Sequence, residues 1–433
     1  MKRERPINAG LPEPEAPEPA AKPEPKRPEA RSKAKPAPPP KPLPPPKGEQ
    51  KPKRRPRPLT PFLLAGLVLV AVAFILAAVL GGTGGSDQGP EKGVPAPAAA
   101  AGGDSRSPGL ASVEELGYPS FATNNTTRIG SSDPATTAAA VALAVYPSRT
   151  ESQRPQAVTL VGEDDWAGAI AASVLMAEPV RAPVLISGSE VTSEALEALQ
   201  PTKTRSISGS SAAKEAAEIA ALRDRLFGSP PSHIVVAPSS RPDLAMPAAA
   251  WAARSGDPVL FAGADNLPAA TATALRRHSK VPVYVLGPSS AISSGVLRAI
   301  GKIAKQVKRV SGEDPVANSV AFARYGDRGF GWNINDPGHG FVLARGDSPL
   351  DAGAAAALSG SGTWGPLLLT DGATKLPAEL RSYFLDVKPG YTDNPTRAFY
   401  NHVWVIGDQE AIDVNQQAEV NELAELAKIG GEG

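Results

Sequence analysis

Three short apolar motifs recur three times, always in the same order, between residues 118 and 433, and this repetition restricts the possible folds more than any other feature. Each motif has the length of a buried β-strand, and a proline is tolerated where it stands at the first position of a strand. Alanine-rich stretches typical of helices separate the motifs. The copies are Val158–Val161, Ile234–Ala237 and Phe341–Ala344; Ala182–Gly188, Asp257–Gly263 and Gly365–Gly372; and Ser206–Gly209, Tyr284–Gly287 and Trp404–Gly407.

A strand–helix–strand–helix–strand succession with continuous apolar strands indicates a parallel sheet covered by helices. We therefore predict an α/β fold with three tandem modules, at residues 118–212, 213–308 and 309–433. Modules of this size, rich in Ala, Gly and Ser, need the surfaces of their neighbours to be stable, so we expect them to pack on one another.

The first 58 residues differ sharply from the rest in composition. They contain 19 prolines, 16 lysines and arginines and seven glutamates, with almost no apolar residue other than alanine. Such a segment cannot bury enough surface to offset the entropy of ordering, so we predict a disordered tail at 1–58. The tail carries a net charge of +9, which leaves −8 for the remainder of a chain whose total is +1.

An uninterrupted uncharged run of 19 residues, Phe62–Leu80, follows the tail. As a helix it just crosses a hydrocarbon core of roughly 30 Å, and we predict a transmembrane helix at 59–81. The cations crowd on its N-terminal side, so the positive-inside rule puts the N-terminus in the cytoplasm and the modules outside. A buried core helix and a cleaved signal peptide are the alternatives. Residues 82–117, rich in Gly, Ala, Pro and Ser, are predicted to be a flexible linker.

Composition excludes several classes of function. The chain has no cysteine, which removes disulfides, thiolate chemistry and cysteine-ligated metals. Its four histidines lie far apart in sequence, which argues against a histidine metal centre, and no cofactor is predicted. The near-zero net charge argues against a nucleic-acid partner.

A further pattern, with an arginine, a glycine and an aspartate, opens the first and third modules at Arg128–Pro134 and Arg309–Pro315. Together with the three motifs, this arrangement resembles the type 2 cell-wall-binding repeat of Gram-positive bacteria. The second module lacks a clean copy of this opening. The positions that fit the family pattern are Arg128, Asp133, Thr137 and Ala138; Arg309, Gly312, Asp314, Asp351 and Ala352; and Tyr284–Gly287 with Ala291–Ser293.

The resemblance implies three Rossmann-like units packed as a pseudo-threefold trimer. It also implies non-covalent retention of a surface protein by anionic secondary wall polymers. The expected function is thus a non-enzymatic, membrane-anchored protein that binds wall polysaccharide or peptidoglycan. Two alternatives stay open: an enzyme acting on wall glycan, and an extracytoplasmic sensor or scaffold that binds a small ligand or a protein. The basic tail is expected to have a cytoplasmic partner of unknown identity.

A ligand is expected at the C-terminal ends of the strands, where helix N-termini and free amides converge. Arg128 and Arg309 are the only cations shared by the two openings, and a guanidinium suits carboxylate or phosphate oxygens. The alternative is that each arginine forms a structural ion pair with the aspartate of its own opening. The candidate ligand-binding residues are Arg128, Asp133, Arg309, Asp314, Ser187, Gly188, Ala262, Gly263, Thr370, Asp371 and Gly372.

Three further features have a structural and a functional interpretation. Gly360–Gly365 matches the letters of a dinucleotide fingerprint but follows a helix and precedes a strand, so we interpret it as a turn. Glu163–Asp165 is either a solvated helix start or a site for Ca²⁺ or acid–base chemistry. Two insertions in the third module, Gly326–Gly340 and Lys388–Asn401, carry aromatic residues that either pack locally or contact sugar rings. Their aromatics are Phe330, Trp332, Tyr391, Phe399 and Tyr400.

Overall fold

The computed structural model describes residues 116–361 and 365–429. Its contacts divide the chain into two units, Met1–Gly102 and Gly103–Gly433, and every described residue belongs to the second. The predicted tail, the predicted membrane span at 59–81 and nearly all of the predicted linker lie outside the described residues. No helix among those that are described combines the length and the apolar character needed to cross a membrane.

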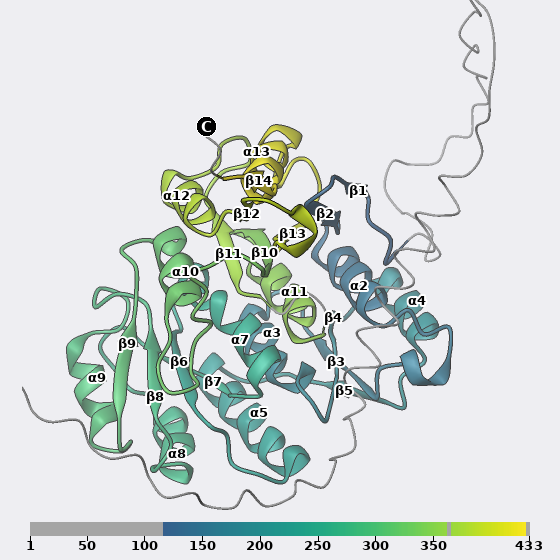
Figure 1. Cartoon of the computed structure of the whole chain (residues 1–433). Coiled ribbons are helices and arrows are strands. Elements are labelled where there is room, and N and C mark those ends of the chain that lie inside the picture. The colour runs from purple at the N-terminus through teal and green to yellow at the C-terminus, as the bar shows by residue number, and fades with distance from the viewer. Residues whose placement is uncertain (1–115, 362–364, 430–433) are drawn as a thin grey trace, which may run out of the picture. The chain divides into compact units, whose positions relative to one another are not determined.

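Parallel sheets with covering helices build the described region, which confirms the predicted mixed α/β fold (Figure 1). There are three such sheets, and the strand of the first motif is central in each, between the strand of the second motif and one further strand. We name the sheets first, second and third by the chain order of these central strands.

The first sheet has the order β4-β3-β5, and all its neighbours are parallel. Its strands are buried along β3 and β4, whereas β5 is mostly exposed. The elements of this part of the chain are α2 (Pro134–Val145), η1 (Glu151–Gln153), β3 (Ala157–Val161), α3 (Trp166–Ala172), η2 (Ser173–Met176), β4 (Val184–Ile186), α4 (Glu190–Leu199) and β5 (Lys203–Ser206).

The second sheet has four parallel strands in the order β7-β6-β8-β9. Strands β6, β7 and β8 are fully buried, as expected for continuous apolar runs covered on both faces. The elements here are α5 (Ala212–Phe227), β6 (Ile234–Pro238), α6 (Pro242–Ala245), α7 (Pro247–Ser255), β7 (Val259–Ala262), α8 (Ala269–Arg277), β8 (Val283–Leu286), α9 (Ser294–Gly301) and β9 (Val307–Val310).

The third sheet has the order β1-β2-β13-β10-β11 and takes two strands from the start of the described region. Only the edge pair β1–β2 is antiparallel. A small parallel pair, β12–β14, stands apart. The elements are β1 (Phe121–Ala122), β2 (Thr126–Ile129), α10 (Pro315–Arg324), β10 (Gly340–Arg345), α11 (Pro349–Ser361), β11 (Leu367–Thr370), α12 (Ala378–Asp386), β12 (Gly390–Tyr391), η3 (Pro395–Arg397), β13 (His402–Ile406), α13 (Val414–Ala424) and β14 (Ala427–Lys428).

The openings of the predicted modules complete the sheets of other modules. β2, which begins the first predicted module, pairs with β13 of the third sheet. β9, whose last residues begin the opening at Arg309, pairs with β8 of the second sheet. Module boundaries at 118 and 309 therefore cut strands away from the sheets to which they are hydrogen-bonded.

The predicted strand Ser206–Gly209 is wrong, because the structure places β5 at Lys203–Ser206 and begins α5 only six residues after β5 ends. The six residues Ser206–Ser211 have the spacing of Arg309–Asp314: glycine is fourth and the N-cap is sixth. The segment is thus the opening of the second module, with Ser206 in place of the arginine. β5, which ends at Ser206, pairs directly with the central strand β3, whereas β9 pairs with β8, so the first sheet has three described strands where the second has four.

Helices α3, α7 and α11 follow the three central strands, and α11 packs on both of the others at the centre of the region (Figure 1). Glycines allow this close approach. A Cβ on Gly353 would lie 2.6 Å from Cβ of Ala169, and one on Gly360 would lie 2.8 Å from the carbonyl oxygen of Ala253. The alanine-rich composition of these helices therefore serves the contact between sheet units.

Candidate ligand-binding site

Arg128 is buried and bonds to the loop that follows β13. Its Nη1 donates to the carbonyl oxygens of Gly407 (3.0 Å) and Asp408, and its Nη2 donates to that of Ile412 (2.5 Å). Nε donates to Oε1 of Gln417 at 3.0 Å. Only 2% of the residue is exposed, and this burial lowers the pKa of the guanidinium from its usual value. Arg128 therefore holds a loop together, and its donors are already engaged.

Arg309 makes the same arrangement in the second sheet. Its Nη1 donates to the carbonyl oxygen of Gly287 at 2.5 Å and its Nη2 to that of Ile292 at 2.6 Å. Gly287 and Gly407 both have a positive φ, which suits glycine in this turn. The two arginines thus hold equivalent loops. Arg128 extends from β2 to the loop after the neighbouring strand β13, and Arg309 extends from β9 to the loop after the neighbouring strand β8.

The aspartates of the two openings do not pair with these arginines, so the predicted Arg–Asp ion pair is wrong. Asp133 accepts from the amide of Thr136 at 2.7 Å and caps α2, and Asp314 accepts from the amide of Ala317 at 2.8 Å and caps α10. Both are favourable N-cap residues because their carboxylates satisfy free amides and the helix dipole.

The loops after the second-motif strands are at the C-terminal ends of three different sheets, as the parallel topology predicts. The hydroxyl of Ser187 bonds back to the carbonyl oxygen of Val161 at 2.9 Å, and the amide of Gly263 bonds to that of Asn266 at 3.1 Å. The hydroxyl of Thr370 bonds to the carbonyl oxygen of Gly372 at 3.1 Å. Gly188 lies beside Glu163, since a Cβ there would be 3.2 Å from Oε1 of that residue.

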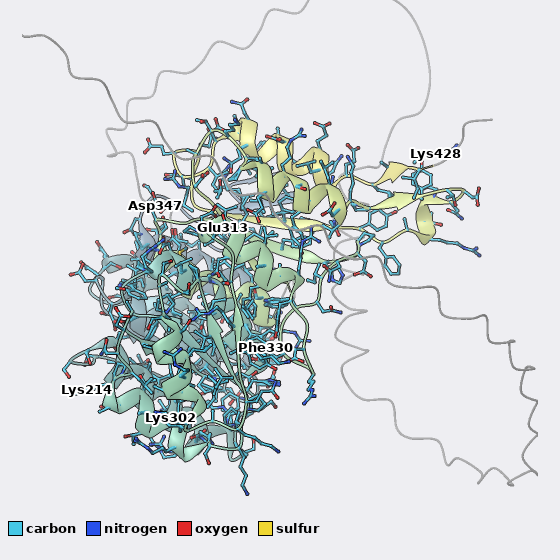
Figure 2. All side chains as sticks on the ribbon, turned by 90° about the vertical axis from the view of Figure 1, so that its left-hand side faces the viewer. Lys214, Lys302, Glu313, Phe330, Asp347 and Lys428 are labelled. Carbon is cyan, nitrogen blue, oxygen red and sulfur yellow. The ribbon has the colours of Figure 1, made fainter. Side chains whose placement is uncertain are left out.

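Three of the predicted residues meet in one pocket. Asp314, Thr370 and Asp371 line a cavity of about 350 Å³, to which Asp243 and Asp347 add two more carboxylates. Asp347 and Glu313, the neighbour of Asp314, mark this side of the molecule in Figure 2. The pocket is acidic, so by itself it offers nothing that attracts an anionic polymer.

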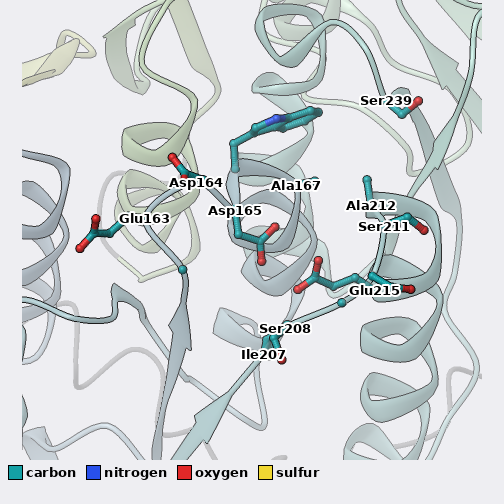
Figure 3. Close-up of a pocket in the computed structure, with 14 residues that line it drawn as sticks. Glu163, Asp164, Asp165, Ala167, Ile207, Ser208, Ser211, Ala212, Glu215 and Ser239 are labelled. Atoms are coloured by element: carbon teal, nitrogen blue, oxygen red, sulfur yellow. The ribbon is translucent and has the colours of Figure 1, made fainter.

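The residue that the sequence analysis missed is Glu215, in the first turns of α5. It lines a pocket of about 540 Å³ with Glu163, Asp164 and Asp165 (Figure 3). Asp165 caps α3 through its Oδ1, which accepts from the amide of Gly168 at 2.8 Å. The predicted helix start at Glu163–Asp165 is therefore present and also forms one wall of the pocket. In the sequence, the one indication of this site is that Glu215 comes four residues after Ser211, the N-cap of α5.

Three carboxyl groups in the described region, Glu215, Asp351 and Glu379, have raised pKa values, and in the first two the pKa comes close to neutrality. Burial, and then Asp165 and Glu218, raise the pKa of Glu215 to about 8. Burial, and then Asp133, Asp347 and Asp408, raise the pKa of Asp351 to about 7. Glu215 lies on the opening helix α5, which packs on α3, whereas Asp351 lies on α11, which follows a central strand and packs on the opening helix α2. The two groups therefore lie at the same kind of helix contact but on opposite partners.

The first insertion of the third module packs against the second sheet. Phe330 is 1% exposed and stacks on Tyr284, with ring centroids 3.6 Å apart. Asp327 accepts from the hydroxyl of Tyr284 (2.7 Å) and from Nζ of Lys308 (2.6 Å). The insertion is thus a structural contact between two sheets. Phe399 and Tyr400 of the second insertion, in contrast, are 70% and 55% exposed.

The remaining sequence features offer no catalytic or metal-binding group. Gly360 and Ser361 end α11 and Gly365 precedes β11, so the match follows a helix and precedes a strand as predicted, and residues 362–364 lie outside the described residues. Within 116–361 and 365–429, no cluster of three or more His, Asp or Glu side chains is suited to a metal ion. The described pockets can therefore bind a ligand through carboxylates, serine hydroxyls and backbone groups.

Two segments of the chain, residues 206–297 and 309–417, match the family model described as cell wall binding domain 2 (CWB2). This confirms the predicted repeat in two copies. The first match begins at Ser206 and the second at Arg309, the two openings that the structure aligns. A third copy in the residues before 206 stays a prediction. Comparison with curated protein sequences finds no match.

Solved structures with a similar fold include two proteins from Clostridium difficile. Cwp6 has a TM-score of 0.56 at 18% sequence identity, covering 69% of this chain and 47% of its own. Cwp8 has a TM-score of 0.51 at 19% identity, covering 70% of this chain and 52% of its own. The chain thus spans about half the length of either protein, and at this identity the likeness concerns the fold.

Proposed function

We propose that this chain is a membrane-anchored, extracytoplasmic protein that binds the bacterial cell wall non-covalently and without enzymatic activity. The match of two segments to the CWB2 model carries the proposal. The first sheet supports it, because its strand order and its helices repeat those of the other two sheets. The ligand is a wall polysaccharide or peptidoglycan.

The wall ligand is proposed to lie along the loops at the C-terminal ends of the strands. Helix N-termini meet there, and Asp133 and Asp314 fix two of them. The small residues at 187–188, 262–263 and 370–372 leave room for a polymer to approach the backbone. Arg128 and Arg309 support these loops from within, by holding the turns at 407–412 and 287–292.

Three tandem copies in a pseudo-threefold arrangement remain part of this proposal, with the second copy beginning at its opening, Ser206, rather than at residue 213. The packing of α11 against both α3 and α7 supports it, since these helices hold equivalent places after the three central strands. A C-terminal deletion that removes residues 309–433 should aggregate, because α3 and α7 would lose the helix that covers them. A monomeric fragment as stable as the whole chain would contradict the arrangement.

The test of wall binding is a sedimentation assay with the full chain in mild detergent. Purified wall with its secondary polymers should retain the protein, and wall stripped of those polymers should retain less if the polymer is the ligand. Equal retention would identify peptidoglycan as the ligand. No retention on either would contradict the proposal and favour a sensor or scaffold.

The membrane anchor is proposed at 59–81, with the N-terminal tail in the cytoplasm and available to a partner there. The support is the sequence: a 19-residue apolar run with its cations on one side. Protease added to intact cells should degrade the C-terminal region and spare an N-terminal tag. A protected C-terminal region would contradict this topology.

A further inference from the structure

The pocket of about 540 Å³ between α3 and α5 contains a pair of facing carboxyl groups, Asp165 and Glu215 (Figure 3). Asp165 comes from the start of α3 and Glu215 from the first turns of α5, so the pair bridges two segments that the sheets hold in place. Gly168 lies beneath both. A Cβ added there would be 2.1 Å from Oδ2 of Asp165 and 2.8 Å from Oε1 of Glu215.

Glu215 is buried without a donor for one of its oxygens. The residue is 4% exposed, and its Oε1 has no hydrogen-bond partner in the protein. A buried acceptor without a donor costs about 1–3 kcal/mol, more if it is charged. The pair can relieve this cost by sharing a proton, and the raised pKa of Glu215 agrees with that state. A ligand that brings its own N–H donors and positive charge would replace the proton.

The charge around the pair decides the sign of such a ligand. Glu215 faces Asp165, Glu218 lies one turn along α5, and Glu163 and Asp164 belong to the loop that leads to α3. An anionic group would meet repulsion from this set, so the phosphates or carboxylates of a wall polymer do not suit this pocket.

A metal ion fits less well than an organic cation. Ca²⁺ takes six to eight oxygen ligands and Mg²⁺ a near-ideal octahedron, and the described residues hold no cluster of three or more candidate metal ligands. A primary ammonium needs only three acceptors. The carboxyl groups of Glu215 and Asp165 supply two, and Ser208, Ser210 and Ser211 line the same pocket with their hydroxyl groups.

We propose that the Asp165–Glu215 pair binds a primary ammonium group. Two sources share this chemistry, an amino sugar with a free amine and the side-chain amine of a wall peptide. The assignment of the ammonium group to a wall component rests on the proposed wall-binding function. The binding of an ammonium group does not, so small probes test that binding separately.

Calorimetric titration of the full chain in mild detergent with Nα-acetyl-lysinamide and with glucosamine tests the proposal. At pH 7.5, where both amines are at least partly protonated, at least one probe should bind, and its uncharged analogue, Nα,Nε-diacetyl-lysinamide or N-acetylglucosamine, should not. Glu215→Gln keeps the shape of the side chain and should weaken binding at least tenfold. Glu197→Gln, an exposed acid on α4 outside the pocket, should leave the affinity within twofold. Thermal melting of both variants checks that they are folded.

The pH dependence provides a second measurement. The lysine amine has an ordinary pKa near 10.4, so from pH 6 to pH 9 it stays charged while Glu215 loses its proton. Affinity for Nα-acetyl-lysinamide should therefore rise with pH in the wild type and stay flat in Glu215→Gln.

Three outcomes would overturn the proposal: no binding of either probe, equal binding by Glu215→Gln, or displacement of the probe by Ca²⁺ with loss of Ca²⁺ binding in Glu215→Gln. The relative affinity of the two probes tells the sources apart. Retention on wall whose free amines have been acetylated tests the link to the wall. If the protein binds a probe but is not retained on any wall preparation, the wall-binding function is contradicted and the ammonium site is still supported.

Discussion

Nη2 of Arg128 donates a hydrogen bond to the backbone carbonyl oxygen of Ile412, which lies 284 residues later in the chain. The bond joins strand β2 of the third sheet to the loop before α13. Arg309 makes the equivalent bond to Ile292 within the second sheet. Equivalent arginines therefore have different reach: Arg309 closes a loop 17 residues away, and Arg128 links the two ends of the described region.

Replacing Arg128 by Gln should destabilise the fold. The substitution removes charge-assisted bonds to buried carbonyl oxygens, at a cost of about 3 kcal/mol, which corresponds to a Tm lower by roughly 5–10 °C. Arg309→Gln should cost less, because that arginine is only partly buried. Thermal unfolding measures both, with the exposed Arg276→Gln as control. Wall retention per folded molecule should not change; lower retention at unchanged Tm would mean that the arginines contact ligand.

Eight of the nine motif strands were predictable from sequence because each is a continuous buried apolar run, a pattern that depends on local residues only. Strands β2 and β9, which contain Arg128 and Arg309, lack this pattern and were not predicted. The exception among the motifs is instructive. Ser206–Gly209 resembles both the end of a third-motif strand and an opening, and β5 is exposed, so hydrophobicity gives no guidance there. Only the spacing of glycine and N-cap, compared with Arg309–Asp314, identifies it as an opening.

The roles of the candidate site residues were less predictable, because they depend on contacts between distant segments. Arg128 takes its acceptors from 407–412, and nothing near it in sequence indicates that. Glu215 belongs to an ordinary amphipathic helix and becomes unusual only when α3 brings Asp165 to face it. Phe330 was expected to pack on its own module or to contact sugar, and it stacks on Tyr284 of the second sheet.

A chain that begins at Asp133 should be far less stable than one that begins at Leu116. The shorter chain lacks β1 and β2, so β13 loses the partners of its amides, including the 2.9 Å bond from Gly407 to Ile129. The clamp of Arg128 is lost as well. We expect a Tm lower by roughly 10 °C or more, or aggregation through the exposed strand edge. Equal melting of the two chains would show that β2 is dispensable.

Gly353→Ala should destabilise the protein although alanine favours helices. The added Cβ would lie 2.6 Å from Cβ of Ala169, which forces α11 and α3 apart, and such overpacking costs about 1–3 kcal/mol. Gly301→Ala is the matched control, since its Cβ would meet nothing closer than 4.0 Å and the helix gains propensity. Urea unfolding should separate the two variants in opposite directions. A neutral Gly353→Ala would mean that the helices can shift without cost.

Phe330→Ala and Phe399→Ala should behave differently. Phe330 is fully buried between two sheets, so its loss should cost about 3–5 kcal/mol. Phe399 is 70% exposed, so its loss should change the free energy of unfolding by less than about 0.5 kcal/mol. If the second insertion contacts sugar, Phe399→Ala should reduce wall retention while the Tm stays constant. Unchanged retention would remove this insertion from the ligand surface.

Asp351 should make the protein less stable as the pH rises from about 4 to about 7. Its side chain is buried at 8% exposure, Oδ1 has no hydrogen-bond partner, and its pKa in the folded protein is raised to about 7. The unfolded chain releases the same proton near pH 3.9. Within this window the folded state binds more protons than the unfolded state, so the free energy of unfolding falls with increasing pH.

Asp351→Asn should therefore raise the free energy of unfolding at pH 8 by about 2–4 kcal/mol and change it little at pH 4, where the wild-type side chain is still protonated in the folded protein. The amide has nearly the shape of the carboxyl group and cannot ionise, so the charged form that burial, Asp133, Asp347 and Asp408 disfavour is no longer reached. Urea unfolding at the two pH values measures the difference, with the exposed Glu410→Gln as control. An equal change at both pH values would assign the effect to packing and leave the ionisation of Asp351 without influence on stability.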